Sequence, residues 1–117
     1  MSILSVNNSI TTDMLFKHGF YKKASYSFYD LRSNIVYNPD HFYKDINIKV
    51  KTLDFDNRLF SFYCRSVLDY EPINHSITLF CKDEIFSNNI LFRGNVEDET
   101  DLMAVISHIE SHIYYPL

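Results

Sequence analysis

The sequence predicts an α+β fold in two layers, an antiparallel sheet of four to five strands with a short N-terminal helix and a C-terminal helix packed on one sheet face. Apolar residues alternate with polar ones in the middle of the chain, as in half-buried strands, and helix signals stand at its two ends. The 117 residues are 46% hydrophobic and 22% charged, with no internal repeat or linker. We therefore expect a single α+β domain over residues 1–117.

The first helix is predicted over "TTDMLFKHGF", residues 11–20. Thr11 or Thr12 is suited to cap its N-terminus, and Asp13 suits the first turn, where the helix dipole favours an acid. Gly19 is placed to end the helix in a left-handed conformation. The pattern predicts a helix of about two turns.

Two weaker strand signals follow this helix. Residues 24–30, "ASYSFYD", alternate well enough for a strand. Residues 33–43 carry Asn, Pro and Asp at turn spacing, which is typical of a loop, with room for a short strand at residues 35–37.

The clearest strand pair is "INIKVKTLDFDNRLFSFYC", residues 46–64. The apolar sides of both strands lie on one face only if Val50 pairs with Phe62, and this pairing requires a three-residue loop over 55–57. A two-residue turn would mix apolar and polar side chains on each face. Asn57 supplies the left-handed residue that such a loop requires. The side chains expected to face the core are Ile46, Ile48, Val50, Phe60, Phe62 and Cys64.

Two further strands and a long helix complete the predicted domain. Strands are expected over residues 76–82 and 89–93, joined by the loop "DEIFSNN". Residues 95–113 have the strongest helix pattern, with acids crowding the first turn. Its apolar stripe consists of Leu102, Val105, Ile106, Ile109 and Ile113. We expect this helix to cover one face of the sheet.

The opposite face of the sheet has no obvious cover and mixes aromatic rings with cations. We therefore predict that it is a partner-binding surface. A solvated sheet face, a protein or self-association surface, and a nucleic-acid surface all remain open for it. The candidate partner-binding residues are Lys49, Lys51, Leu53, Leu59, Tyr63, Arg65, Phe80 and Lys82, with Asn47 and Arg93 beside them.

Charge and motifs argue against several function classes. The net charge of −4 has the wrong sign for a general nucleic-acid binder and is too small for a DNA mimic. The sequence holds no nucleophile elbow, no glycine-rich phosphate loop and no CxxC motif, so we expect no enzyme, no catalytic residue and no cofactor. The acidic run "EDETD", residues 97–101, reads as a helix start or as a mimic of phosphates.

Histidine and cysteine contribute two more predictions. His108 and His112 have the i, i+4 spacing of helix-borne metal ligands, but "HIESH" lacks the zinc-protease motif, and we predict no metal site. Cys64 and Cys81 lie inside apolar strands, so we expect a reduced pair of core residues, with a disulfide as the alternative. The N-terminus "MSILSVNNSI" resembles no signal peptide, and a cytoplasmic protein without a membrane partner is expected.

The layout of the chain resembles a known class of protein. A short helix closed by "LFKHGFYKK", a series of Tyr/Phe-rich strands and the final "VEDETDLMAVISHI" helix are similar to small phage and prophage accessory proteins of AT-rich bacteria. That class includes inhibitors of bacterial defence systems such as anti-CRISPRs. The resemblance implies a non-catalytic protein partner in a bacterial host, for example a defence nuclease or its RNA-bound complex, and it transfers no functional residue. Direct nucleic-acid binding and a homodimer are the alternative functions.

Overall fold

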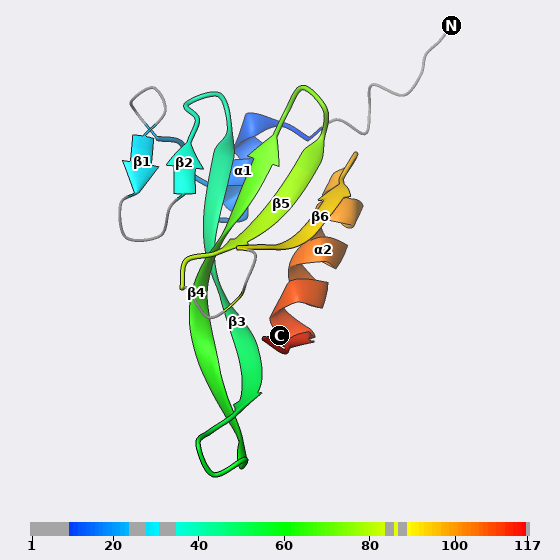
Figure 1. The fold of residues 1–117 in the computed structure, drawn as a ribbon. Helices are drawn as coiled ribbons and strands as arrows, with labels where there is room; N and C mark the ends of the chain where they lie inside the picture. The colour runs from blue at the N-terminus through cyan, green and yellow to red at the C-terminus, as the bar shows by residue number, and fades with distance from the viewer. Residues whose placement is uncertain (1–9, 24–27, 31–34, 84–85, 87–88, 117) are drawn as a thin grey trace, which may run out of the picture.

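The structure, a computed structural model, describes residues 10–23, 28–30, 35–83, 86 and 89–116, the side chains of 28–30 excepted (Figure 1). It confirms the α+β class, with a curled five-stranded sheet in the order β6-β5-β4-β3-β7 and a separate β1–β2 pair. The elements are α1 (Thr12–Lys17), β1 (Phe28–Asp30), β2 (Ile35–Tyr37), β3 (Phe42–Leu53), β4 (Leu59–Glu71), β5 (Ser76–Cys81), β6 (Ile90–Asn95), α2 (Glu99–Ser111) and β7 (Ile113–Tyr114). Residues 24–27 of the first predicted strand lie outside the described residues.

Helix α1 begins and ends where its sequence signals predict. The Thr11 side chain caps the helix by accepting a hydrogen bond of 3.2 Å from the main-chain N–H of Met14. Gly19 follows the helix at φ 88°, a backbone conformation that glycine adopts without strain. A Cβ atom at Gly19 would also lie 3.0 Å from Nζ of Lys44, which donates to the carbonyl of His18.

The β3–β4 hairpin has the predicted register. Val50 pairs with Phe62, and the ladder closes at Leu53 and Leu59. The loop over residues 55–57 contains Asn57 at φ 61°, the predicted left-handed residue. Because the register is the predicted one, the alternation of apolar and polar residues along both strands determines which side chains face α2.

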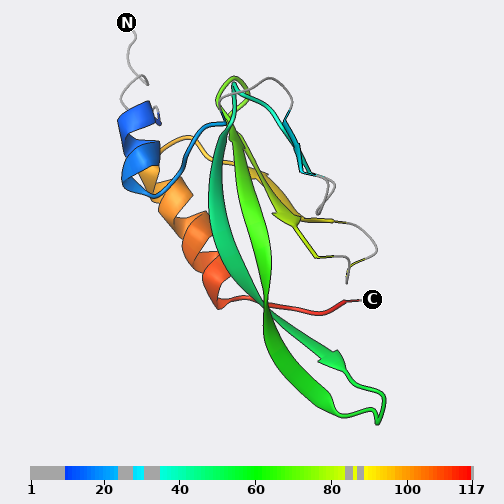
Figure 2. The same ribbon diagram turned by 90° about the vertical axis from the view of Figure 1, so that its left-hand side faces the viewer.

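Helix α2 lies on one face of the sheet and closes the main core (Figure 2). Asp98 caps it by accepting from the main-chain N–H of Asp101 at 2.8 Å. Leu102 and Ile109 are fully buried against core residues of the sheet. Neither helix of the described residues has the length and apolar character needed to cross a membrane.

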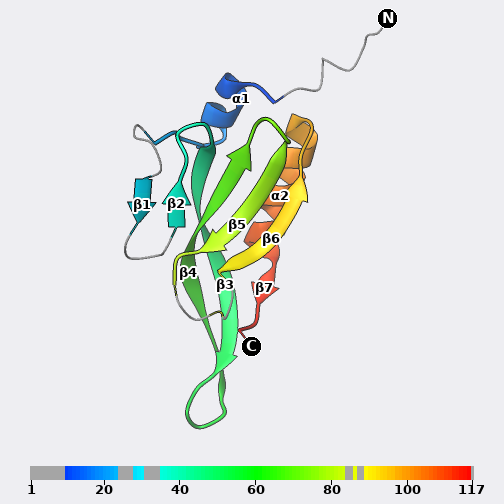
Figure 3. The same ribbon diagram turned by 45° about the horizontal axis from the view of Figure 1, so that its top comes forward.

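Both ends of the helix predicted over residues 95–113 differ from the structure, in which Asn95 still belongs to β6 and α2 begins at Glu99. The spacing of Ile109 and Ile113 predicts a helix to residue 113, but His112 is extended at ψ 148° and the helix ends at Ser111. Ile113 and Tyr114 instead form β7, a parallel partner of β3 that the views place beside it (Figure 3). An i, i+4 pair of apolar residues cannot distinguish one more helical turn from a short strand.

An ion-pair cluster ties α1 to the start of α2. Oε2 of Glu99 lies 2.7 Å from Nζ of Lys17 and 2.7 Å from Nε2 of His18. These hydrogen bonds, first that of Lys17 and then that of His18, lower the pKa of Glu99. The acidic start of α2 therefore has a structural role, since Asp98 caps the helix and Glu99 holds α1.

The lowered pKa of Glu99 predicts how stability depends on pH. A carboxyl with a depressed folded-state pKa contributes stability above its unfolded-state pKa and loses it as the pH falls through the folded-state value. We expect the advantage of the wild type over Glu99→Gln in unfolding free energy to shrink as the pH falls below the ordinary value of 4.5. Urea unfolding at several pH values measures it. The control is Glu110→Gln, at an exposed acid of α2, and an equal pH trend in both variants would contradict the prediction.

Candidate partner-binding face

The sheet face opposite α2, here called the reverse face, is divided into a covered and an open half. Ile35 and Tyr37 of β2 pack on Tyr43 and Val67 to form a second buried cluster over the upper half. The ring centroids of Tyr37 and Tyr43 lie 4.7 Å apart in an edge-on contact. The expectation that the reverse face has no cover is therefore wrong for this half.

Two of the eight candidate binding residues belong to the covered half. Phe80 is half-buried and packs against the second cluster. The Lys82 side chain is only 16% exposed, and its Nζ lies 3.3 Å from Oδ1 of Asp45. Phe80 therefore contributes to the second cluster and Lys82 to an ion pair, so both residues have a structural role.

The other six candidates lie together on the arm, defined as residues 49–65, which lie within the part of the β3–β4 hairpin that β5 does not flank. Leu53, Leu59 and Tyr63 are 58%, 59% and 67% exposed. Arg65 is exposed, whereas Lys49 and Lys51 are half-buried. The structure thus brings these six side chains onto one ribbon, which projects past α2 (Figures 1 and 2).

The arm also exposes aromatic rings that the sequence analysis assigned to the core or to a turn. Phe60 is 44% exposed and stacks on the half-buried Phe62 with ring centroids 5.5 Å apart, and Phe55 at the tip is fully exposed. Val50 and Cys64 are buried as expected, so α2 covers the α2-side face of the hairpin only up to this point. The lengths of the predicted helix and strands would have indicated this exposure, because a helix rises about 1.5 Å per residue and a strand about 3.3 Å.

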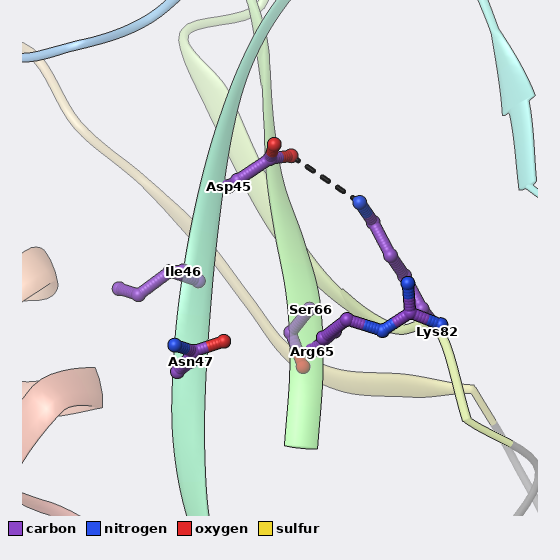
Figure 4. A pocket seen from close by; sticks show the side chains of 6 residues that line it. All are labelled: Asp45, Ile46, Asn47, Arg65, Ser66 and Lys82. Atoms are coloured by element: carbon purple, nitrogen blue, oxygen red, sulfur yellow. Dashed lines mark hydrogen bonds and ion pairs between the residues drawn. The ribbon is translucent and has the colours of Figure 1, made fainter. Parts of the chain in front are cut away.

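A polar recess of about 320 Å³ lies where the covered half meets the arm (Figure 4). Asp45, Arg65 and Lys82 point into it, and Asp45 and Lys82 pair across it. Nη2 of Arg65 lies 3.9 Å from Oδ1 of Asp83, a second contact between opposite charges. Since both cations face a carboxylate, the recess offers little uncompensated charge to an anion.

A histidine–aspartate pair borders a second recess of about 210 Å³ at the other end of the hairpin. Nδ1 of His41 lies 2.8 Å from Oδ1 of Asp69. Burial raises the pKa of Asp69, and His41 opposes that rise. The described side chains lining the recess include no hydroxyl or thiol. Only the strand register brings these two residues together, and the sequence analysis did not single them out.

The remaining histidines and cysteines add no further cluster. His108 on α2 and His112, which follows the helix, are both exposed, and their ring centroids lie 5.1 Å apart. Within the described residues, no group of three or more His, Cys, Asp and Glu side chains is arranged to hold a metal ion. Cys64 and Cys81 are buried core residues with free thiols, and burial raises the pKa of Cys64 to about 12.

Comparison of the chain with protein-family models, with curated proteins and with solved structures finds no match. The candidate face therefore has to be assessed from its own geometry.

The cover on the upper reverse face gives a matched pair of stability predictions. Ile35 is 2% exposed in the second cluster, whereas its neighbour Val36 is 57% exposed. We expect Ile35→Ala to lower the unfolding free energy by about 2–5 kcal/mol and Val36→Ala by about 0.5 kcal/mol or less. Urea unfolding of both variants measures the difference. Equal, small losses would show that β2 does not bury the reverse face.

Proposed function

We propose that this protein is a non-catalytic binding module that acts by occupying the surface of a partner protein with its arm. The observation that carries the proposal is the concentration of exposed apolar side chains there. Of the ten large apolar side chains exposed among the described residues, five lie on the arm, namely Leu53, Phe55, Leu59, Phe60 and Tyr63. Scattered apolar residues are normal on a protein surface, but a concentration of them on one projecting element indicates a binding site.

The charges on the arm differ in sign from those on the rest of the chain. Residues 49–65 contain four cationic and two acidic side chains, a local charge of +2, whereas the whole chain carries −4, so the remainder carries −6. Aromatic rings beside arginine and lysine are suited to the centre and rim of a protein interface. An acidic protein surface is the complementary partner, and the positive arm would be steered towards it.

The resemblance to phage accessory proteins suggests a more specific form of this proposal. In that form, the protein acts in the cytoplasm of a bacterial host and inhibits a defence nuclease or its RNA-bound complex by covering a surface that the nuclease needs. Direct nucleic-acid binding is the second candidate, and it is favoured only by the local charge of the arm. The acidic tip residues Asp54 and Asp56 count against it, because they would meet phosphates.

Charge reversal on the arm tests the partner-binding proposal. We expect the double variant Lys49→Glu/Arg65→Glu to reduce capture of a host partner at least about tenfold while thermal unfolding stays nearly unchanged, because rim charges affect association more than folding. Affinity capture from the native host, with and without nuclease treatment, measures it. Arg93→Glu, at an exposed residue of β6, is the matched control and should capture like the wild type.

Two outcomes would contradict the proposal. Undiminished capture by the double variant would show that the arm is not the binding surface. Capture that disappears after nuclease treatment and weakens steeply with salt would identify nucleic acid as the partner.

A further inference from the structure

Strand β4 has one edge that no strand of the described residues occupies along the arm. β5 pairs with β4 only between Ser66 and Glu71. Just before this ladder, the main-chain N–H of Lys82 donates to the carbonyl of Arg65 at 2.9 Å. Within the part of the chain that the structure describes, the free edge therefore lies between the hairpin loop and Arg65, and a free strand edge presents unpaired N–H and C=O groups.

The register of the hairpin shows which main-chain groups point outward along this edge. The N–H of Asp54 donates to the carbonyl of Arg58 at 2.9 Å, so the main chain at Arg58 faces β3. In an antiparallel ladder this orientation alternates, and Phe60, Phe62 and Cys64 also face β3. The N–H and C=O groups that point outward therefore belong to Leu59, Ser61 and Tyr63. The carbonyl of Arg65, which accepts from Lys82, also points outward, as this alternation predicts.

In its own sequence, the free edge lacks the charged residues and prolines that normally prevent strands from associating. Residues 59–64, "LFSFYC", contain no charged residue and no proline. Natural proteins protect such edges with lysine, proline, bulges or a covering segment, because an uncharged apolar edge pairs readily with another strand. This edge is therefore suited to receive a strand from outside the chain.

We propose that the free edge of β4 pairs with the same edge of a second copy of this chain, antiparallel about a two-fold axis at Ser61. In this register Ser61 exchanges main-chain hydrogen bonds with Ser61 of the second copy, and Leu59 does so with Tyr63. Every outward N–H and C=O of the three free residues is then used. An axis at Phe62 instead would require the carbonyl of Arg65, which already accepts from Lys82.

The side chains are complementary in the same register. Phe60 lies opposite Phe62 of the second copy on the face towards α2, in the closely spaced kind of pair that favours aromatic contact. Leu59 lies opposite Tyr63 on the reverse face. No two like charges oppose each other along residues 58–64, because Arg58 faces Cys64. Each interface residue thus finds an apolar or neutral partner.

Charge and area further support a second copy as the occupant. The pairing places Asn57 opposite Arg65 of the second copy, so the neighbouring acid Asp56 approaches the exposed Arg65 side chain. If each of the four apolar side chains buries about 100 Å², both copies together bury about 800 Å² in addition to the main-chain edge. This area is at the low end for a specific interface, so the dimer should dissociate on dilution. The pairing leaves Lys49, Lys51 and Leu53 of the reverse face, which lie on β3, outside the new ladder, and it does not depend on the partner-binding proposal.

Disulfide trapping tests the position of the axis. In the dimer the Cα atoms of residue 61 in the two copies are opposite neighbours, within the separation of up to about 6.8 Å that a disulfide spans. Lys51, which pairs with Ser61 in the hairpin, lies on the same face but about three strand spacings, or about 14 Å, from its equivalent. We expect Ser61→Cys to form covalent dimers under mild oxidation at least about tenfold faster than Lys51→Cys. The wild type, with its buried Cys64 and Cys81, controls for native thiols.

Light scattering on the unaltered chain provides the second measurement. The mass of the wild type should rise from monomer towards dimer with concentration. Ser61→Pro should stay monomeric while folded, because proline removes an N–H that points away from β3. Equal cross-linking of the two cysteine variants, or a wild type that is monomeric at every concentration, would overturn the proposal. If the wild type is always monomeric, the occupant of the edge is a strand of a different protein.

Discussion

The structure depends on a difference in length between two elements with the same number of residues. Strand β4 and helix α2 each contain 13 residues. At about 3.3 Å per residue the strand spans about 43 Å, whereas at about 1.5 Å per residue the helix spans about 20 Å. The helix therefore covers the hairpin over only half of its length. The other half projects as the arm (Figure 1).

The covered half is stabilised on both faces of the sheet. On one face α2 buries Ile48, Val50 and Cys64, and on the other β2 buries Tyr43 and Val67. Beyond that point the same alternation continues, and none of the described helices or strands covers it. Apolar side chains that would be core residues in a shorter hairpin become exposed, and the arm has an apolar surface on both faces. The exposed apolar side chains on which the proposed binding role rests therefore follow from the strand pattern.

The sequence was sufficient wherever a local rule decides the structure. The hairpin register follows from face parity and from Asn57, and the start of α1 follows from the capping residue Thr11. It was insufficient where contacts between distant segments decide. Nothing in "NIVY" indicates that Ile35 and Tyr37 pack on the reverse face, and the parallel pairing of Ile113 with Lys49 has no local signal. Six of the eight candidate residues share the arm because alternation places them there, whereas Phe80 and Lys82 belong to packing that only the fold reveals.

Amide hydrogen exchange along β4 tests the central claim, that the arm has a free edge, most directly. In dilute solution the N–H groups of Phe60 and Phe62, which face β3, should exchange slowly, whereas the outward N–H of Ser61 should exchange almost as fast as in an unfolded peptide. Protection of Ser61 should then increase with protein concentration as a second copy occupies the edge. Strong protection of Ser61 that does not change on dilution would show that the chain covers this edge itself, and would contradict the account.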